Sequence, residues 1–156
     1  MSDPIRIAID AMGGDGGPTV TISASISYLQ KYPQTEFHLF GDELLINDAL
    51  EKFEIKTLQS QITIVPCASL VTDDDRPSKT LRAKQDSSMA QAVRAIRDGT
   101  CDACVSAGNT GALMAFGMQS LGTFPGISRP AICGSIPTKK GGYLALDLGA
   151  NLSCVP

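Results

Sequence analysis

The chain has no tryptophan, a single histidine and few aromatic residues, and each shortage narrows what it can do. Three Tyr and five Phe are too few for the stacking platforms that hold nucleic-acid bases, and a net charge of −3 does not favour nucleic acid as a partner. No apolar run approaches the roughly 20 residues of a membrane span. The one histidine, His38, lies inside a strand-like run, which disfavours a Ser-His-Asp triad.

Cysteines occur five times, mostly in apolar or strand-like contexts that are typical of buried free thiols in a reducing cytoplasm. Cys101 and Cys104 form a Cys-x-x-Cys pair. A redox pair opens a helix after a strand, whereas this pair precedes a predicted strand. No second pair or neighbouring histidine completes a zinc site. The N-terminus has no basic segment ahead of an apolar one, so we expect a cytoplasmic protein without a signal peptide.

Apolar runs alternate with helical patterns along the 156 residues. We predict strands at 5–10, 36–40, 61–66, 103–107, 131–137 and 142–147, helices at 19–31, 42–53, 88–98 and 110–121, and a polar loop at 67–78. This alternation predicts an α/β fold with three layers, in which helices cover both faces of a largely parallel sheet. Since the last strand-like run has no covering helix, we expect residues 1–156 to form a single α/β domain or the N-terminal part of a larger α/β protein.

The run Ser106-Ala-Gly-Asn-Thr-Gly111 joins a predicted strand to a predicted helix. Its glycines let the backbone bend and approach a ligand closely, and the free N–H groups at a helix start attract an anion. Ser106, Asn109 and Thr110 add hydrogen-bonding side chains. The turn is typical of a site for phosphate or a developing oxyanion, and equally of a capped turn in which Asn109 or Thr110 begins the helix.

Three further polar segments follow predicted strands. In open α/β sheets ligands bind outside the carboxyl ends of the strands, so we expect all four segments at one edge of the sheet. Besides the turn, these segments hold Asp10, Gly13, Gly14 and Asp15, then Ser87 and Ser88, and finally Asp147 and Asn151. The three aspartates could bind a metal, act as a base or cap turns, and their spacing does not select among these roles.

Nucleotide motifs are incomplete in this chain. Gly14-Asp-Gly16 begins a dinucleotide fingerprint, but Thr19 stands where its third glycine would be, and no Gly-Lys-Ser/Thr completes a Walker loop.

A cationic stretch follows the third predicted strand and contains Arg76, Lys79, Arg82 and Lys84. It could hold phosphate or an acidic partner, or it could be a solvated loop whose charges balance the acidic run at 73–75.

Five motifs, taken in order, resemble those of the PlsX family of phosphate acyltransferases in bacterial phospholipid synthesis. The motifs are Asp10-Ala-Met-Gly-Gly-Asp-Gly-Gly-Pro18, Arg82-Ala-Lys-Gln-Asp-Ser-Ser-Met89, Ser106-Ala-Gly-Asn-Thr-Gly-Ala-Leu-Met114, Arg129-Pro-Ala131 and Leu146-Asp-Leu-Gly-Ala-Asn151. The resemblance implies a fold like that of isocitrate and isopropylmalate dehydrogenases. It also implies chains roughly twice this length, so that the C-terminal half is absent here.

The activity implied by the resemblance is formation of acyl phosphate from acyl-[acyl carrier protein] and inorganic phosphate, without a cofactor or metal. Family members are cytoplasmic homodimers that associate peripherally with the membrane, which we expect to involve the absent half. Phosphate itself is the nucleophile, so the reaction needs no activated Ser, Cys or His, only groups that hold phosphate and stabilise an oxyanion.

On this basis we predict that Ser106, Asn109 and Lys84 are catalytic. The predicted substrate-binding residues are Asp10, Gly13, Gly14, Asp15, Lys79, Arg82, Ser87, Ser88, Gly108, Thr110, Gly111, Arg129, Asp147 and Asn151. Two alternatives stay open. The chain could be an inactive fragment that binds phosphate or acyl carrier protein, or it could resemble a phosphotransacetylase that uses coenzyme A thioesters.

Overall fold

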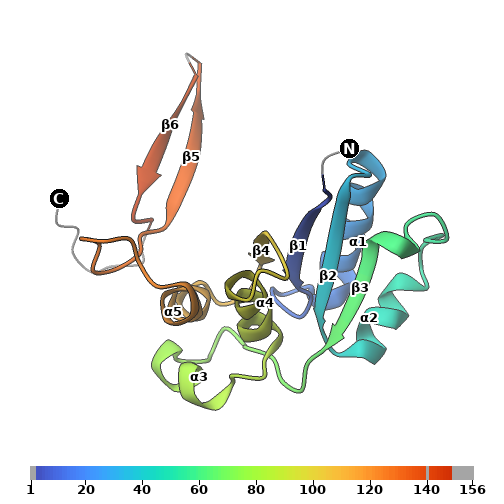
Figure 1. The fold of residues 1–156 in the computed structure, drawn as a ribbon, viewed down its shortest axis with the longest axis horizontal. Helices are drawn as coiled ribbons and strands as arrows, with labels where there is room; N and C mark the ends of the chain where they lie inside the picture. The colour runs from blue at the N-terminus through green and yellow to red at the C-terminus, as the bar shows by residue number, and fades with distance from the viewer. Residues whose placement is uncertain (1–2, 140, 149–156) are drawn as a thin grey trace. The chain divides into compact units, whose positions relative to one another are not determined.

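The first 121 residues alternate between strands and helices in a computed structural model that describes residues 3–139 and 141–148 (Figure 1). The strands of this unit are β1 (Ile5–Asp10), β2 (Thr35–Gly41), β3 (Ile62–Pro66) and β4 (Ala103–Ser106). Its helices are α1 (Gly17–Lys31), α2 (Glu43–Leu50), α3 (Pro77–Ala83), α4 (Ser88–Arg97) and α5 (Thr110–Leu121), with a short 3-10 turn, η1, at Gln59–Gln61. The four strands form one parallel sheet in the order β3-β2-β1-β4.

The strand order reverses direction at β1. From β1 the chain moves outward through β2 and β3 on one side, then crosses back to place β4 on the other side. The register pairs Asp10 with Ser106, which are the last residues of β1 and β4. The carboxyl ends of two strands at such a reversal flank the usual ligand crevice of open α/β sheets. The fold therefore brings the turn after β1 and the turn after β4 together at this place.

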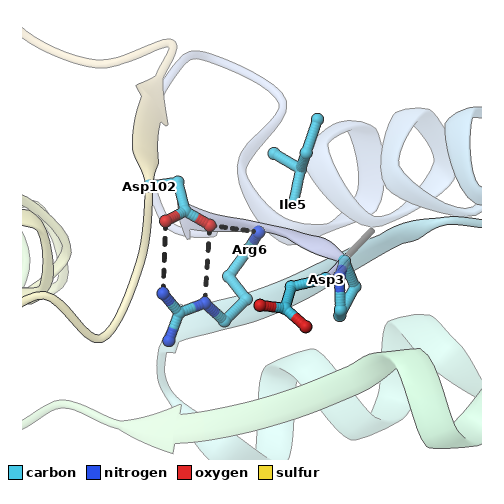
Figure 2. A pocket seen from close by; sticks show the side chains of 5 residues that line it. Asp3, Ile5, Arg6 and Asp102 are labelled. Atoms are coloured by element: carbon cyan, nitrogen blue, oxygen red, sulfur yellow. Dashed lines mark hydrogen bonds and ion pairs between the residues drawn. The ribbon is translucent and has the colours of Figure 1, made fainter. Parts of the chain in front are cut away.

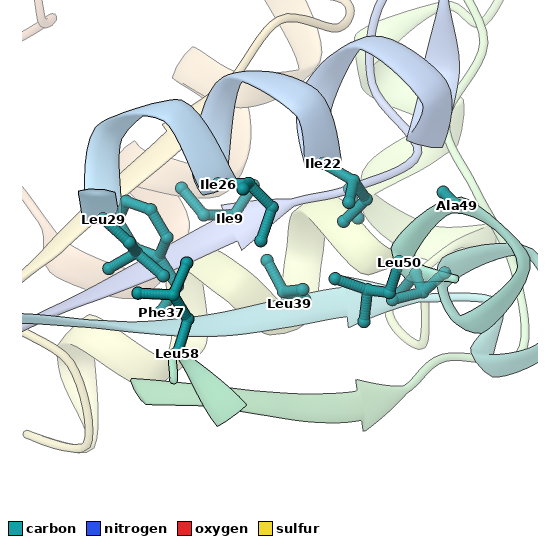
Figure 3. Packing of buried hydrophobic residues seen from close by; sticks show 11 residues of the cluster. Ile9, Ile22, Ile26, Leu29, Phe37, Leu39, Ala49, Leu50 and Leu58 are labelled. Atoms are coloured by element: carbon teal, nitrogen blue, oxygen red, sulfur yellow. The ribbon is translucent and has the colours of Figure 1, made fainter. Parts of the chain in front are cut away.

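One face of the sheet is covered by α1 and α2. Side chains alternate along a strand, so Ile9 of β1 and Phe37 and Leu39 of β2 point to the same face. They pack against Ile22, Ile26 and Leu29 of α1 and Ile46, Ala49 and Leu50 of α2, as Figure 3 shows for most of this cluster. Burying an aliphatic or aromatic side chain contributes about 1.5–3 kcal/mol, so this cluster supplies much of the stability of the unit.

The opposite face is covered by α4. Ala8 and Phe40 of the sheet pack there against Ala92 and Ala95 of α4. On its outer side α4 carries Met89 and Val93, which pack against Ala112 and Phe116 of α5. The alternation that directs Ala8 toward α4 also directs Asp10 to the α4 face, near the start of that helix. The predicted α/β class is thus confirmed, with a parallel sheet and helices on both faces.

A second unit begins after Leu121 and contains an antiparallel hairpin of β5 (Cys133–Thr138) and β6 (Gly141–Leu146). The sequence predicts both strands, but the expectation that the strand before Asp147 belongs to the largely parallel sheet is wrong. In the described residues, β6 pairs with β5 in a separate sheet, so Asp147 does not follow a strand of the parallel sheet. None of the helices in the described ranges is both long and apolar enough to cross a bilayer.

A second correction concerns the predicted polar loop, which in part is helical. Residues 77–83 form α3, with Pro77 in its first turn, where a missing amide N–H costs nothing. The helix buries Thr80, and Leu81 packs against the cluster of α4 and α5. Pattern analysis misses α3 because its seven residues are too short to show a helical period.

Candidate anion-binding site

The turns after β1 and β4 are in contact through their glycines. A Cβ atom added to Gly13 would lie 2.8 Å from the Gly108 nitrogen and 2.8 Å from Asp10 Oδ2. A Cβ added to Gly108 would lie 3.3 Å from Gly13 Cα and 3.1 Å from Met89 Cε. Gly14 has φ +83°, which favours glycine over any other residue. The two turns meet so closely because neither has a side chain at the point of contact.

Beneath these turns, three groups form a chain of hydrogen bonds. Ser106 Oγ donates to Asp10 Oδ2 at 2.6 Å, and the Gly108 amide donates to Ser106 Oγ at 3.1 Å. Asp10 is only 2% exposed, and its Oδ1 has no hydrogen-bond partner among the described residues. A buried carboxylate that accepts a hydroxyl proton fixes the direction of that hydroxyl, so Asp10 orients Ser106 and Ser106 orients the turn.

Asn109 caps α5, and both ends of its side-chain amide have hydrogen-bond partners. Its Oδ1 accepts from the Ala112 amide at 3.0 Å, and its backbone carbonyl accepts from the Leu113 amide at 3.0 Å. Its Nδ2 donates to the carbonyls of residues 72, 73 and 75 at 3.0–3.2 Å. The side chain that the sequence predicts as catalytic therefore holds a helix and a loop in place.

The start of α5 leaves backbone donors uncommitted. Within the described ranges, the amide N–H groups of Asn109, Thr110 and Gly111 have no acceptor. Thr110 and Gly111 are exposed, so these amides and the Thr110 hydroxyl can be reached from solvent. The first amides of a helix attract an anion through their free N–H groups and through the helix dipole.

Lys84 lies at the end of α3, and its ammonium group already has partners. Lys84 Nζ donates to the Leu70 carbonyl at 2.9 Å and forms an ion pair with Asp75. The hydrogen bond from Lys84 is the main reason that the pKa of Asp75 lies below its usual range, and the Thr72 amide adds to the effect. The sequence indicates Asp75 only as one charge of an acidic run, and its role in this network was not predicted. No sequence pattern shows which of three adjacent aspartates pairs with Lys84.

Three exposed cations lie on and beside α3. Arg76, Lys79 and Arg82 are exposed, and they form no ion pair with another described residue. Their spacing of three residues places them on one side of the helix. A Cβ added to Gly111 would lie 2.9 Å from Pro77 Cγ, so α3 begins against the first turn of α5. The helix that carries these cations therefore starts beside the first turn of α5.

The start of α4 contributes Ser87 and Ser88, which are both buried. Ser87 Oγ caps α4 by accepting from the Ala90 amide at 3.3 Å, and it donates to the Lys84 carbonyl at 2.6 Å. Ser88 Oγ has no partner among the described residues. The chain passes from the end of α4 into the amino end of β4, so α4 runs antiparallel to that strand. The start of α4, with both serines, therefore lies at the carboxyl edge of the sheet.

The structure thus gathers most of the predicted site residues but not all of them. Turns and helix starts at one edge bring together Asp10, Gly13, Gly14, Ser87, Ser88, Ser106, Gly108, Asn109, Thr110 and Gly111. Lys79 and Arg82 lie on α3, which begins against α5 and ends at Lys84. Asp15 is exposed in the turn before α1. Arg129 and Asp147 belong to the second unit, and Asn151 lies outside the described residues.

The cysteine pair, of which Cys101 is buried and Cys104 half-buried, is unreactive in character. Burial raises the pKa of Cys104 to about 12 and the pKa of Cys67 to about 11, and burial also raises the pKa of Cys101. These thiols are un-ionised at neutral pH, whereas a redox or nucleophilic cysteine needs a lowered pKa. In the described part of the chain, no group of three or more His, Cys, Asp or Glu residues is arranged to hold a metal ion.

A pocket at the amino end of β1 is lined by an ion pair, so its charged groups already bind one another. Arg6 and Asp102 line it and face one another in Figure 2, where two guanidinium bonds of 3.2 and 3.4 Å reach the Asp102 carboxylate. The Arg6 amide donates to the same carboxylate at 2.8 Å. These bonds join β1 to β4 at the amino ends of the strands, away from the candidate site.

Fold and site together define an open α/β protein that presents helix amino ends and cations at the point where its strand order reverses, a class suited to binding anions. A family model described as "Fatty acid synthesis protein" matches residues 5–156, and the chain belongs to this family. The phosphate acyltransferase of Teredinibacter turnerae is 48% identical over 158 residues, which cover 99% of this chain and 46% of that protein.

Other relatives give the same picture. The phosphate acyltransferase of Pseudomonas aeruginosa is 46% identical over 99% of this chain and 45% of that protein. The one from Paraburkholderia phytofirmans is 43% identical over 97% of this chain and 41% of that protein. The chain therefore spans less than half the length of these relatives. The resemblance to phosphate acyltransferases that the sequence motifs indicate is confirmed.

Proposed function

We propose that the protein containing this chain transfers an acyl group from acyl-[acyl carrier protein] to inorganic phosphate and so makes acyl phosphate. The observation that carries the proposal is the start of α5, where Thr110 and Gly111 are exposed and their amides have no acceptor among the described residues. The printed names of the relatives, phosphate acyltransferases, supply the chemistry that this anion site would serve.

In the proposed reaction a phosphate oxygen attacks the thioester carbonyl carbon. A carbon–oxygen bond forms, the carbon–sulfur bond breaks, and the proton of hydrogen phosphate ends on the released thiol. The amides of Thr110 and Gly111 hold the phosphate, with the α5 dipole favouring its negative charge. Preorganised donors of this kind stabilise charge without reorganising during the reaction, so the site needs no protein nucleophile.

The groups below the turn have a supporting role in this proposal. Asp10 and Ser106 fix the turn from beneath through their hydrogen bond, and the contact of Gly13 with Gly108 keeps it close to the end of β1. Asn109 anchors α5 to the loop that precedes α3. A displacement of about 1 Å in such positioning can cost roughly a hundredfold in rate.

The cationic surface formed by Arg76, Lys79 and Arg82 is proposed to receive the acidic carrier protein. Free guanidinium and ammonium groups beside the phosphate amides would guide an acidic partner toward them and raise the rate of association. Charge reversal at Arg82 should then raise KM for the carrier-bound substrate and leave KM for phosphate unchanged. Reversal of Lys52, an exposed lysine just after α2, is the matched control.

Further features of the proposal come from the family resemblance. They are an isocitrate dehydrogenase-like fold for the whole protein, a cytoplasmic homodimer, peripheral membrane association, and contributions from Asp15, Arg129, Asp147 and Asn151 to substrate binding. Catalysis without a cofactor or metal is part of the same proposal.

The test is acyl phosphate formation by the complete gene product, followed by trapping with hydroxylamine. We expect hydroxamate only when phosphate and a long-chain acyl-[acyl carrier protein] are both present. Turnover of acetyl coenzyme A in place of the carrier would instead identify a phosphotransacetylase. Phosphate binding without turnover of either donor would contradict the proposed enzyme and favour a binding role.

A further inference from the structure

The loop between β3 and α3 is tied directly to the start of α5. Asn109 Nδ2 donates to the carbonyls of Thr72 and Asp73 at 3.2 Å each and to that of Asp75 at 3.0 Å. The other end of the same amide caps α5 through the Ala112 amide. Because one planar group makes both sets of bonds, the loop at residues 70–75 determines where Asn109 lies, and with it the first turn of α5.

Asp75 and Lys84 hold that loop from within. The Asp75 carboxylate accepts from the Thr72 amide at 2.7 Å and from the Thr72 hydroxyl at 3.0 Å, and it pairs with Lys84. Lys84 Nζ also donates to the Leu70 carbonyl at 2.9 Å, so it joins both ends of the loop. The two side chains are only 24% and 28% exposed, which strengthens their attraction relative to a surface pair.

We propose that Asp75 and Lys84 are positioning residues, which set the open amides of α5 by fixing the loop at 70–75 that holds Asn109. This inference rests on the proposed function, since the amides of Thr110 and Gly111 are taken to bind phosphate. It changes the role of Lys84, which the sequence predicts as catalytic. Its ammonium group faces Asp75 and the Leu70 carbonyl, so it acts on phosphate through Asn109.

The two roles of Lys84 predict opposite effects of a change at Asp75. If Lys84 bound phosphate directly, Asp75→Asn would remove a competing negative charge and tighten phosphate binding. If the pair positions the loop, Asp75→Asn loosens the loop and weakens phosphate binding. The sign of the change in affinity therefore separates the two roles.

The experiment measures the Kd for inorganic phosphate by calorimetry, and KM and kcat where the enzyme turns over, in the complete gene product. We expect Asp75→Asn and Lys84→Met each to raise the phosphate Kd about tenfold, and the double variant to match either single one. Lys84→Arg, which keeps the ion pair, should restore most of the affinity. Arg6→Ala is the control, since it breaks another ion pair at the amino ends of β1 and β4 and should leave the phosphate Kd unchanged.

Tighter phosphate binding by Asp75→Asn would overturn the inference, as would wild-type affinity in Lys84→Met. Multiplying effects in the double variant would contradict it as well, because independent contacts add in free energy. Wild-type protein that binds phosphate but makes no acyl phosphate would contradict the proposed function alone, because the comparison of Kd values would still stand. Wild-type protein that binds no phosphate would contradict both.

Discussion

Replacing Gly13 by alanine tests the contact between the two turns. An added Cβ would lie 2.8 Å from Asp10 Oδ2, 2.8 Å from the Gly108 nitrogen and 3.0 Å from Ser106 Oγ. All three atoms belong to the hydrogen-bonded chain beneath the turn, so none can move without breaking a bond. Gly13 does not have a positive φ, so the alanine backbone is allowed and the cost comes from crowding alone.

The size of the effect follows from two opposing contributions. Overpacking by one methyl group costs about 1–3 kcal/mol, while the loss of glycine freedom in the unfolded chain returns roughly 0.4–1 kcal/mol. We therefore expect Gly13→Ala to lower the free energy of unfolding by about 1–2 kcal/mol and to lower Tm by roughly 2–8 °C. Phosphate affinity should fall as well, because the crowded atoms support the α5 turn.

A matched glycine provides the control. Gly117 lies in the middle of α5, and a Cβ added there meets nothing within 4 Å. Gly117→Ala should raise the free energy of unfolding by about 0.5–1 kcal/mol, since alanine is the better helix former. Urea unfolding of both variants measures the difference. Wild-type stability and phosphate affinity in Gly13→Ala would refute the close contact of the turns.

Three further predictions concern the core, acid stability and the thiols. Phe116→Ala, which empties a fully buried position between α4 and α5, should cost about 3–5 kcal/mol in urea unfolding, and a loss below 1 kcal/mol would contradict the packing. The pKa values of Asp75 and Asp102 are lowered in the folded protein, so their stabilising contribution is present above the usual aspartate pKa and is lost as the pH falls through the folded values. When unfolding is measured from pH 6 down to pH 2, the free energy of unfolding should therefore fall less in Asp75→Asn than in the wild type. An equal fall in both proteins would contradict the lowered pKa of Asp75. Among Cys67, Cys101, Cys104 and Cys133, the exposed Cys133 should react fastest with iodoacetamide in the native protein, and equal labelling of the half-buried Cys104 would contradict its pKa of about 12.

Local patterns were sufficient to predict most of the first unit. The largely apolar segment Ile5–Asp10 marks a parallel strand whose second half is buried, and the face of α4 that carries Met89 and Val93 shows a clear helical period. Asp42 immediately precedes α2 and caps it, accepting from the Leu44 and Leu45 amides, as an aspartate at a helix start commonly does. These features depend on neighbours in sequence, so the sequence alone reveals them.

Features that depend on distant partners were beyond such patterns. The antiparallel pairing of β5 with β6 depends on which strands become neighbours in the fold, and the sequence pattern of neither strand indicates this. The networks of Asn109 and Lys84 likewise join residues 9–37 positions apart, so sequence reasoning found these residues but not their bonds. It predicted a site where helix starts and glycine turns gather, and it could not separate the residues that hold the turn from those left open to a ligand.

The most direct test of the account is the phosphate KM of two variants at Thr110 in the complete gene product. Proline fits the first position of a helix, so Thr110→Pro removes one amide N–H of α5 and keeps the helix. Thr110→Ala keeps that amide and removes only the hydroxyl. The account predicts that Thr110→Pro raises the phosphate KM by about tenfold to a hundredfold and clearly more than Thr110→Ala does, as expected for losing a hydrogen bond to a charged group. An unchanged KM in a folded Thr110→Pro protein would contradict an anion site at the start of α5.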